Sequence, residues 1–374
     1  MAGYIMNLND EESIKKCIET GTYSTILKEP KNGKWNIAQE GTFADYFSMQ
    51  EGDSIYFFHK RKIYGIGKIV NVNGECKYLN YKDADIPIIQ SQDQYFNNYP
   101  LLEYGNVNNR CFCTFVPEPL FFMNGVDMDD VLSSNSEKFK IFRTMQQVSF
   151  IKVDDEENKA LRDIILKRNE EYISTGKNCF EFNPQFHINI ENNMRWFHRM
   201  EAYNILLSAS NDKKIKHEMA IEASLCEQLC KENDTPFGRW DYISHQVAAS
   251  PFKPIHYMDK MDVFGYKYIE GFDTISKYLV IEIKKDEAGA EVIEQIMKYV
   301  DWINREYSHG DYSMIEAYIV AAKISDEVVE LKKEQCIRNY MKGYRPTKVC
   351  TWQEVKLVEY EFDSATGSIK YTIK

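Results

Sequence analysis

An apolar segment in the second half of the chain carries charged residues at a regular spacing. Side chains alternate between the two faces of an extended strand, so Glu282 and Lys284 would point to the same side. The opposite side would be apolar, formed by Leu279, Ile281 and Ile283. The pattern predicts a strand that presents one carboxylate and one ammonium group from an otherwise apolar surface.

The residues after this strand change to a helical period. A turn is predicted over residues 286–290 and a helix over residues 291–306. Gln295 and Tyr299 are four positions apart, so they would form a polar stripe on this helix. Its core-facing side would be apolar: Val292, Ile293, Ile296, Val300 and Ile303. Upstream, Asp262 stands at the start of another short apolar run, which predicts a neighbouring strand.

Helical and extended patterns alternate through the rest of the second half. Strands are predicted over residues 314–324 and 350–362, and helices over residues 215–231 and 325–340. Ser325 begins the last of these helices, and serine is a residue type that caps helix N-termini. Strands and helices that alternate around one acidic centre predict an α/β sandwich.

The first half of the chain has more strands than helices. A strand and an amphipathic helix fit the first 25 residues, a β-hairpin fits residues 54–70 and a charged helix fits residues 154–169. The acids that open the last helix suit a helix N-terminus better than a metal site. We therefore expect two domains, α+β and then α/β, with these limits: residues 1–168, a partly helical linker over 169–210, and residues 211–374.

The charged residues of the second half suggest phosphate chemistry. A carboxylate on an apolar strand can bind a divalent cation, and a nearby ammonium stabilises negative charge on a phosphate under attack. Asp262 would offer a second oxygen ligand beside Glu282. The alternative for Glu282 and Lys284 is a salt-bridged pair on a solvated face. The alternative for Gln295 and Tyr299 is an ordinary exposed stripe of a helix.

Acidic, lysine, glutamine and tyrosine positions follow the order D…E-x-K…Q-x-x-x-Y: Asp262, Glu282, Ile283, Lys284, Gln295 and Tyr299. This order resembles the PD-(D/E)xK nuclease superfamily, in particular its RecB-like and NucS-like branches. The proline of the family name is absent, since Met261 precedes Asp262. The family also carries an acidic residue on a helix before the core, which Glu222 matches, with Glu218 as the weaker match. The resemblance covers about residues 211–374.

The resemblance implies a restriction-endonuclease-like α/β/α core that hydrolyses phosphodiester bonds. Asp262, Glu282 and the carbonyl of Ile283 would bind magnesium, or manganese in its place. Glu222 would be a further acidic contributor, directly or through water.

The other motif residues would act on the nucleophile and the phosphate. Lys284 would position the attacking water or help to deprotonate it, and would offset the phosphate charge. Because a cation flanked by carboxylates keeps its proton, electrostatic stabilisation is favoured over true base action. Gln295 and Tyr299 would orient this lysine or a DNA phosphate. All three are therefore expected to be catalytic residues alongside the carboxylates.

The first half resembles the PUA superfamily, and more narrowly its EVE and YTH-like domains. The residues that carry this resemblance are a strand and an aromatic-Ser-Thr turn, residues 4–6 and 23–25, and a Gly-Asp strand followed by a Gly-x-Gly strand, residues 52–53 and 65–67. The resemblance implies a β-barrel with helices that reads a modified base in an aromatic cage. A base stacked on aromatic side chains gains about 1–3 kcal/mol.

The residues that would contact such a base are Tyr23, Ser24 and Trp35. Tyr23 stands where the family usually has Trp. Because most aromatic residues of a small barrel belong to its core, packing is the alternative interpretation for Tyr23 and Trp35.

Composition narrows the class of protein. The 374 residues, 44% of them hydrophobic, are enough for two cores. The net charge of −11 argues against a general nucleic-acid coat protein, but not against a nuclease with an acidic site and local basic contacts. Nine cysteines lack complete zinc-site spacing, so reduced thiols are expected. No apolar run approaches the ~20 residues that span a bilayer, so we expect a soluble, cytoplasmic protein without a membrane partner.

Together these features predict a magnesium-dependent DNA endonuclease whose first domain reads a flipped modified base. Its substrate would be double-stranded, modified DNA, and its role would be type IV-like restriction of foreign or phage DNA. One alternative is a NucS-like nuclease for mismatched or branched DNA in repair. Another is a non-catalytic nucleic-acid-binding protein. Double-strand cutting needs two sites, so a homodimer is expected.

Overall fold

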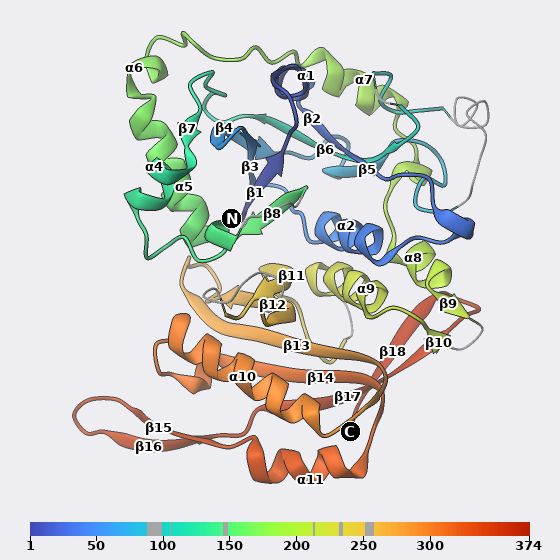
Figure 1. The fold of residues 1–374 in the computed structure, drawn as a ribbon, viewed down its shortest axis with the longest axis vertical. Helices are drawn as coiled ribbons and strands as arrows, with labels where there is room; N and C mark the ends of the chain where they lie inside the picture. The colour runs from blue at the N-terminus through green and yellow to red at the C-terminus, as the bar shows by residue number, and fades with distance from the viewer. Residues whose placement is uncertain (88–98, 105, 145–148, 212–213, 232–234, 251–257) are drawn as a thin grey trace. The chain divides into compact units, whose positions relative to one another are not determined.

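The computed structural model describes residues 1–374 except 88–98, 105, 145–148, 212–213, 232–234 and 251–257. The chain forms two compact units, and neither is a continuous stretch of sequence (Figure 1). The first unit comprises Met1–Lys34 and Met49–Met200, and the second comprises Trp35–Ser48 and Glu201–Lys374. These limits differ from the expected ones, because residues 169–200 belong to the first unit and residues 35–48 belong to the second.

The first unit is built on an eight-stranded sheet with the order β2-β6-β4-β3-β1-β8, in which β5 pairs with β6 and β7 with β4. Only β1 and β3 run parallel among the described pairings. The predicted hairpin is confirmed as β3 and β4. The α+β class is also confirmed, but these pairings do not close the sheet into a barrel. The strands are β1 (Gly3–Asn7), β2 (Thr22–Ile26), β3 (Ser54–His59), β4 (Lys62–Ile69), β5 (Lys77–Leu79), β6 (Asn109–Pro117), β7 (Val126–Asp127) and β8 (Phe150–Val153).

Helix termini of the first unit follow from local capping. The Asp10 side chain accepts the N–H of Ser13, and Gly21 ends the first helix with a left-handed φ of 61°. The predicted acidic helix start is confirmed, because Asp154 caps the N-terminus of α5 and Glu157 accepts the N–H of Phe142. The helices are α1 (Glu11–Thr20), η1 (Lys31–Gly33), α4 (Met128–Ser134), η2 (Phe142–Thr144), α5 (Asp155–Arg168), α6 (Glu170–Ile173), α7 (Gln185–Asn193) and η3 (Trp196–His198).

The second unit contains a six-stranded mixed sheet with the order β11-β12-β13-β14-β17-β18. The central strands β13, β14 and β17 run parallel. Both faces of β13 are buried, as expected for a central parallel strand covered by helices. Helix α9 packs against β11, β12 and β13, and α10 packs against β13 and β14 (Figure 1). The sheet strands are β11 (Tyr242–Ala248), β12 (Lys260–Tyr268), β13 (Ile275–Ala288), β14 (Ile315–Ile324), β17 (Val355–Asp363) and β18 (Ser368–Ile373).

Several predicted elements of this unit are confirmed. Helix α10 spans Glu291–Glu306, and its five predicted core residues are buried. Asp262 lies on β12, and Ser325 accepts the N–H of Val328 as the cap of α11. The remaining elements are α8 (Ala202–Ser208), β9 (Ser210–Asn211), β10 (Lys214–Ile215), α9 (Glu218–Cys230), η5 (Tyr312–Met314), α11 (Asp326–Gln335), β15 (Arg338–Lys342) and β16 (Lys348–Trp352).

Three predictions for this unit are wrong because cross-strand pairing outweighs the local pattern. The turn predicted over residues 286–290 is replaced by a continuation of β13, whose Ala288 pairs with Ile324 of β14. The helix predicted to reach residue 340 ends at Gln335, and the residues beyond it form a hairpin of β15 and β16. The strand predicted over residues 350–362 is divided between β16 and β17.

Helix α2 (Ile37–Phe47) is the part of the second unit that comes from the first half of the sequence. Asn36 and Gln39 form a capping box at its start. The helix packs mainly against α9. Its sequence contains Gly41 and Thr42, which have low helix propensity, so pattern alone gives little signal for it.

Two expectations from composition can be compared with the structure. None of the helices in the described part of the chain is both long and apolar enough to cross a membrane. The nine cysteines are free thiols, as predicted from their incomplete spacing. Five of them are buried, which suits a role as small apolar core residues.

Candidate active site

Four of the predicted catalytic side chains converge in the second unit. Asp262 comes from β12, Glu282 and Lys284 from β13, and Glu222 from α9. The antiparallel register pairs Val263 with Ile281, which brings Asp262 beside Glu282 at the end of this ladder. Neighbouring strands and one packed helix therefore gather groups that lie as much as 62 positions apart in the sequence.

Glu282 is fully buried and accepts a hydrogen bond from a lysine. Lys284 Nζ donates to Glu282 Oε1 over 2.6 Å, while Glu282 Oε2 is buried and has no hydrogen-bond partner among the described residues. Asp262 Oδ2 accepts the backbone N–H of Ile283 over 2.8 Å. The alternative of a salt bridge on a solvated face is therefore wrong, because the Glu282 side chain is 1% exposed and that of Lys284 24%.

Several carboxylates lie close together in this buried site, and this shifts the pKa values of its side chains. Burial raises the pKa of Asp262 well above its ordinary value, and the charges of Glu282 and Glu222 raise it further. Burial also raises the pKa of Glu282 to about 7, although the ion pair with Lys284 opposes this shift. Burial lowers the pKa of Lys284, but the hydrogen bond and charge of Glu282 outweigh burial and raise it. Lys284 is accordingly a cation at neutral pH.

Gln295 and Tyr299 connect this lysine to the backbone of β12. Gln295 Oε1 lies 3.4 Å from Lys284 Nζ, and its Nε2 donates to Tyr299 Oη over 3.1 Å. Tyr299 Oη in turn donates to the carbonyl of Lys260 over 2.7 Å. Tyr299 is 3% exposed, so the alternative of an ordinary exposed stripe is wrong for it. The pair limits the positions that the ammonium of Lys284 can adopt.

The predicted metal ligands suit a hard cation by their chemistry. Magnesium prefers carboxylate and carbonyl oxygens, and Glu282 Oε2 is a buried carboxylate oxygen that accepts no hydrogen bond within the part of the chain that the structure describes. Asp262 Oδ1 has one long contact, 3.3 Å from Gln246 Nε2. Within the described ranges, however, no three His, Cys, Asp or Glu side chains already form a metal-binding group. The oxygen atoms of these residues therefore fit magnesium by their chemistry. In the present side-chain positions, however, Glu282 forms an ion pair with Lys284.

Gln246 is a site residue that the sequence patterns did not indicate. It stands opposite Asp262 in an unbroken register, because His245 pairs with Val263 and Val247 pairs with Met261 of β12. Its φ of 52° is unusual for a residue with a side chain and is a form of strain found at functional sites. Gln246 Nε2 lies 3.1 Å from both carboxylate oxygens of Glu222. The amide therefore bridges Glu222 and Asp262.

His245 supports Glu222 from the other side. Its Nδ1 lies 3.5 Å from Glu222 Oε2, and its Nε2 lies 2.8 Å from Asp45 Oδ1 of α2. Burial lowers the pKa of His245, but the charges of Asp45 and Glu222 outweigh burial and raise it to about 10. His245 is therefore an imidazolium between two carboxylates at neutral pH.

A second histidine pairs with the same helix without touching these carboxylates. His217, which precedes α9, lies 2.8 Å from Glu40 Oε1 of α2. Glu218, the weaker of the two candidate helical acids, accepts the backbone N–H of Lys285 over 3.3 Å. Of the two acids, Glu222 is therefore the one held by Gln246 and His245.

The three predicted base-binding residues fall in different parts of the molecule. Tyr23 and Ser24 line a cavity of about 430 Å³ in the first unit. Tyr23 is 4% exposed, with its ring centroid 6.3 Å from that of Phe57, so most of it belongs to the core. Trp35 belongs to the second unit, where it is 2% exposed and packs against Phe43. Trp35 therefore does not line the cavity of Tyr23 and Ser24.

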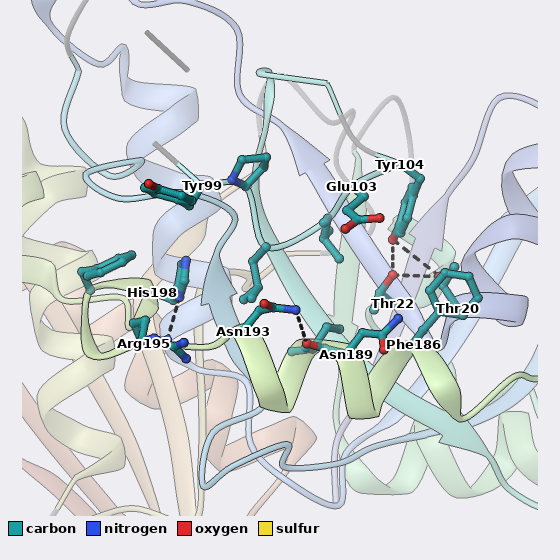
Figure 2. A pocket seen from close by; sticks show the side chains of 15 residues that line it. Thr20, Thr22, Tyr99, Glu103, Tyr104, Phe186, Asn189, Asn193, Arg195 and His198 are labelled. Carbon is teal, nitrogen blue, oxygen red and sulfur yellow. Dashed lines mark hydrogen bonds between the residues drawn. The ribbon is translucent and has the colours of Figure 1, made fainter. Parts of the chain in front are cut away.

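The first unit also contains a larger cavity, of about 910 Å³ (Figure 2). Residues 99–104, helix α7 and η3 supply most of its lining, with Thr20 and Thr22 at one end. Tyr104 lines this cavity and also the smaller one. The sequence patterns gave no indication of it, because its walls come from segments far apart in the chain.

Comparisons with known proteins add little to this geometry. No protein-family model matches the sequence, and no curated protein matches it. A repair endonuclease from Pyrococcus abyssi is similar over 34% of this chain and 46% of its own, with 21% identity and a TM-score of 0.22. A protein from Agrobacterium tumefaciens is similar over 44% and 93%, with 14% identity and a TM-score of 0.26. A hypothetical protein from Leishmania major is similar over 46% and 96%, with 16% identity and a TM-score of 0.27. The chain thus spans less than half of the endonuclease, and these TM-scores are too low to support an argument.

Proposed function

We propose that the second unit is a magnesium-dependent nuclease that hydrolyses phosphodiester bonds in DNA. The observation that carries this proposal is the buried convergence of Asp262, Glu282 and Lys284, with Glu222 beside them. Burying like charges together costs stability, and such arrangements are found at functional sites, where the reaction needs them. A folded but non-catalytic binding protein would gain nothing from this cost.

Each side chain has a definite task in the proposed reaction. Asp262, Glu282 and the carbonyl of Ile283 would hold magnesium, which activates water and polarises the phosphate when bound. Lys284 keeps its proton, so it orients the attacking water by donating a hydrogen bond and offsets charge on the phosphate. Gln295 and Tyr299 hold the ammonium of Lys284 in place.

Gln246 and His245 act as positioning residues in this proposal. Gln246 donates to Glu222 and lies near Asp262, while His245 lies between Glu222 and Asp45. A buried carboxylate with charged or amide partners on two sides has few alternative positions. Glu222 is thereby kept in place next to the predicted metal ligands.

For the first unit, we propose that a base flipped out of double-stranded DNA enters the cavity lined by Tyr23 and Ser24. This cavity lies within the usual size range of small-molecule sites, about 300–1,000 Å³. A modified base would make the enzyme a modification-dependent nuclease for restriction of foreign or phage DNA. Since both strands must be cut, two copies of the chain would act together.

The test is cleavage of one plasmid prepared in unmodified, adenine-methylated and cytosine-modified forms, with magnesium and then manganese. Glu282→Gln, which keeps the size of the side chain but removes its charge, should abolish cleavage. Cleavage of only one modified form of the plasmid would support the proposal that the first unit binds a modified base. Equal cutting of all forms would leave the nuclease in place and direct attention to mismatched or branched duplexes. Unchanged cleavage by Glu282→Gln would refute the assigned catalytic site.

A further inference from the structure

The larger cavity of the first unit is a neighbour of the cavity lined by Tyr23 and Ser24. Tyr104 lines both of them. Its hydroxyl is hydrogen-bonded to Thr22, and the ammonium of Lys16 lies 5.1 Å from the centre of its ring. Tyr104 is thus held by both contacts and is a lining residue common to the two cavities.

The floor of the larger cavity is part of the hydrophobic core. Leu101, Leu102 and Ile190 line the cavity and belong to one buried apolar cluster, against which Tyr104 packs. Phe186 of α7 adds a second aromatic surface. This floor is well suited to a flat, apolar group such as the face of a nucleobase.

Polar groups of complementary kinds also line this cavity. Figure 2 shows Asn189 and Asn193 rising from α7, with Tyr104 towards one end of the cavity and Arg195 towards the other. Asn193 Nδ2 donates to the carbonyl of Asn189, and Asn189 Oδ1 accepts from Gln185. Among the described residues, these bonds use the oxygen of the Asn189 amide and the nitrogen of the Asn193 amide, which leaves a donor on Asn189 and an acceptor on Asn193. An amide donor and acceptor together match the edge of a base.

The charge at the far end suits a phosphate. Arg195 uses Nη1 to donate to the carbonyls of Asn192 and Met194, which fixes the guanidinium at the rim of the cavity. Arg195 is an exposed residue, and the fork of N–H groups of a guanidinium binds phosphate well. His198, behind it, accepts the backbone N–H of Arg195 and holds this turn of the chain.

We propose that the larger cavity binds the nucleotide next to the one held by Tyr23 and Ser24. Its base would stack on Tyr104 and Phe186, with its edge at Asn189 and Asn193, and its phosphate would pair with Arg195. The proposal rests on the proposed function in one respect, that the first unit binds DNA. The reader would then contact two successive nucleotides, and the identity of the second would matter to specificity.

The experiment measures binding without cleavage. Fluorescence anisotropy follows the full chain, in EDTA, as it binds a labelled single-stranded DNA of about eight nucleotides. Abasic sites are placed in turn at each position of this probe. Asn193→Trp fills the cavity from an exposed position of α7, and Arg195→Ala removes the phosphate partner. Asn192→Ala is the matched control, because Asn192 lies on the same helix but does not line the cavity.

We expect abasic sites at two adjacent positions to weaken binding by the unchanged protein. Asn193→Trp should weaken binding about tenfold and reduce the sensitive positions to one, while Asn192→Ala changes neither. Arg195→Ala should weaken binding of every probe to a similar extent and reduce its salt dependence. Binding by Asn193→Trp and Arg195→Ala equal to the unchanged protein would overturn the proposal, as would a single sensitive position or no binding of the probe. Since Glu282→Gln affects cleavage alone, failure of the nuclease assignment would be seen separately.

Discussion

Asp45 and His245 are 200 positions apart in the sequence, and Asp45 Oδ1 lies 2.8 Å from His245 Nε2. The aspartate belongs to α2, which enters the second unit from the first half of the chain. Through His245 this aspartate is connected to Glu222 and, by way of Gln246, to Asp262. The geometry of the proposed active site therefore depends on a residue far from any motif.

Replacing Asp45 tests this dependence. Asp45→Asn removes the charge that holds His245, so Glu222 loses a fixed partner and we expect kcat to fall about tenfold at unchanged KM, a loss of ~1.4 kcal/mol. Plasmid cleavage at saturating magnesium is the measurement. Glu40→Gln is the matched control, because Glu40 makes the same kind of pair with His217 from the same helix. Equal losses of kcat in the two variants would mean that only the packing of α2 matters.

The crowded carboxylates predict that activity and stability are in conflict at Asp262. Asp262→Asn removes one of the buried charges, while its amide oxygen can still accept the N–H of Ile283. We expect cleavage to be lost and the free energy of unfolding to rise by ~1 kcal/mol, which is ~2–4 °C in melting temperature for a unit of this size. Calorimetry in EDTA measures the change in melting temperature, and Asp273→Asn, at an exposed position, is the control. A lower melting temperature of Asp262→Asn would contradict the account of crowding.

The buried His198 predicts a loss of stability in weak acid. Burial lowers the pKa of its imidazole from the ordinary 6.5 to about 4. The folded protein therefore favours the neutral form, so this stabilisation is present above pH 6.5 and is lost as the pH falls through 6.5 towards 4. The full loss would be up to ~3 kcal/mol.

Urea unfolding at pH 7 and pH 5 measures this contribution. Other groups also titrate in this range, so the informative quantity is the difference between the unchanged protein and His198→Gln. His198→Gln should lose less stability between the two pH values than the unchanged protein does. The exposed His309→Gln serves as the control. Parallel losses in the unchanged protein and His198→Gln would show that His198 does not titrate as proposed.

The spacing of apolar residues was sufficient to predict those elements whose local preference agrees with their tertiary packing. Helix α10 has an apolar face at helical spacing, so its limits could be predicted to the residue. The D…E-x-K order located Asp262, Glu282 and Lys284 because strand alternation fixes which side chains share a face. These cases need no knowledge of distant parts of the chain.

Gln246 and Asp45 could not be found in this way. Gln246 enters the site with a positive φ, which has no pattern in the single sequence. Asp45 reaches it because α2 packs against α9, a contact between segments about 180 residues apart. Similarly, Trp35 was predicted to bind the base because of its place in the first half of the sequence, whereas it packs in the second unit. Long-range packing, which no local pattern encodes, decided the positions of Asp45 and Trp35.

This packing predicts that the second half of the chain is not an independent domain. Helix α2 buries Phe43, Ala44 and Phe47, and its removal would expose apolar surface on α9 and leave His245 without Asp45. A protein of residues 201–374 alone should therefore aggregate or melt well below the full chain. Joining residues 35–48 to it through a flexible linker should restore solubility, and Asp45→Asn in the joined protein should again reduce cleavage. Scanning calorimetry and solubility of the two proteins are the measurements. If residues 201–374 alone were soluble, cooperative in unfolding and fully active, α2 would be dispensable and the role assigned to Asp45 would fall with it.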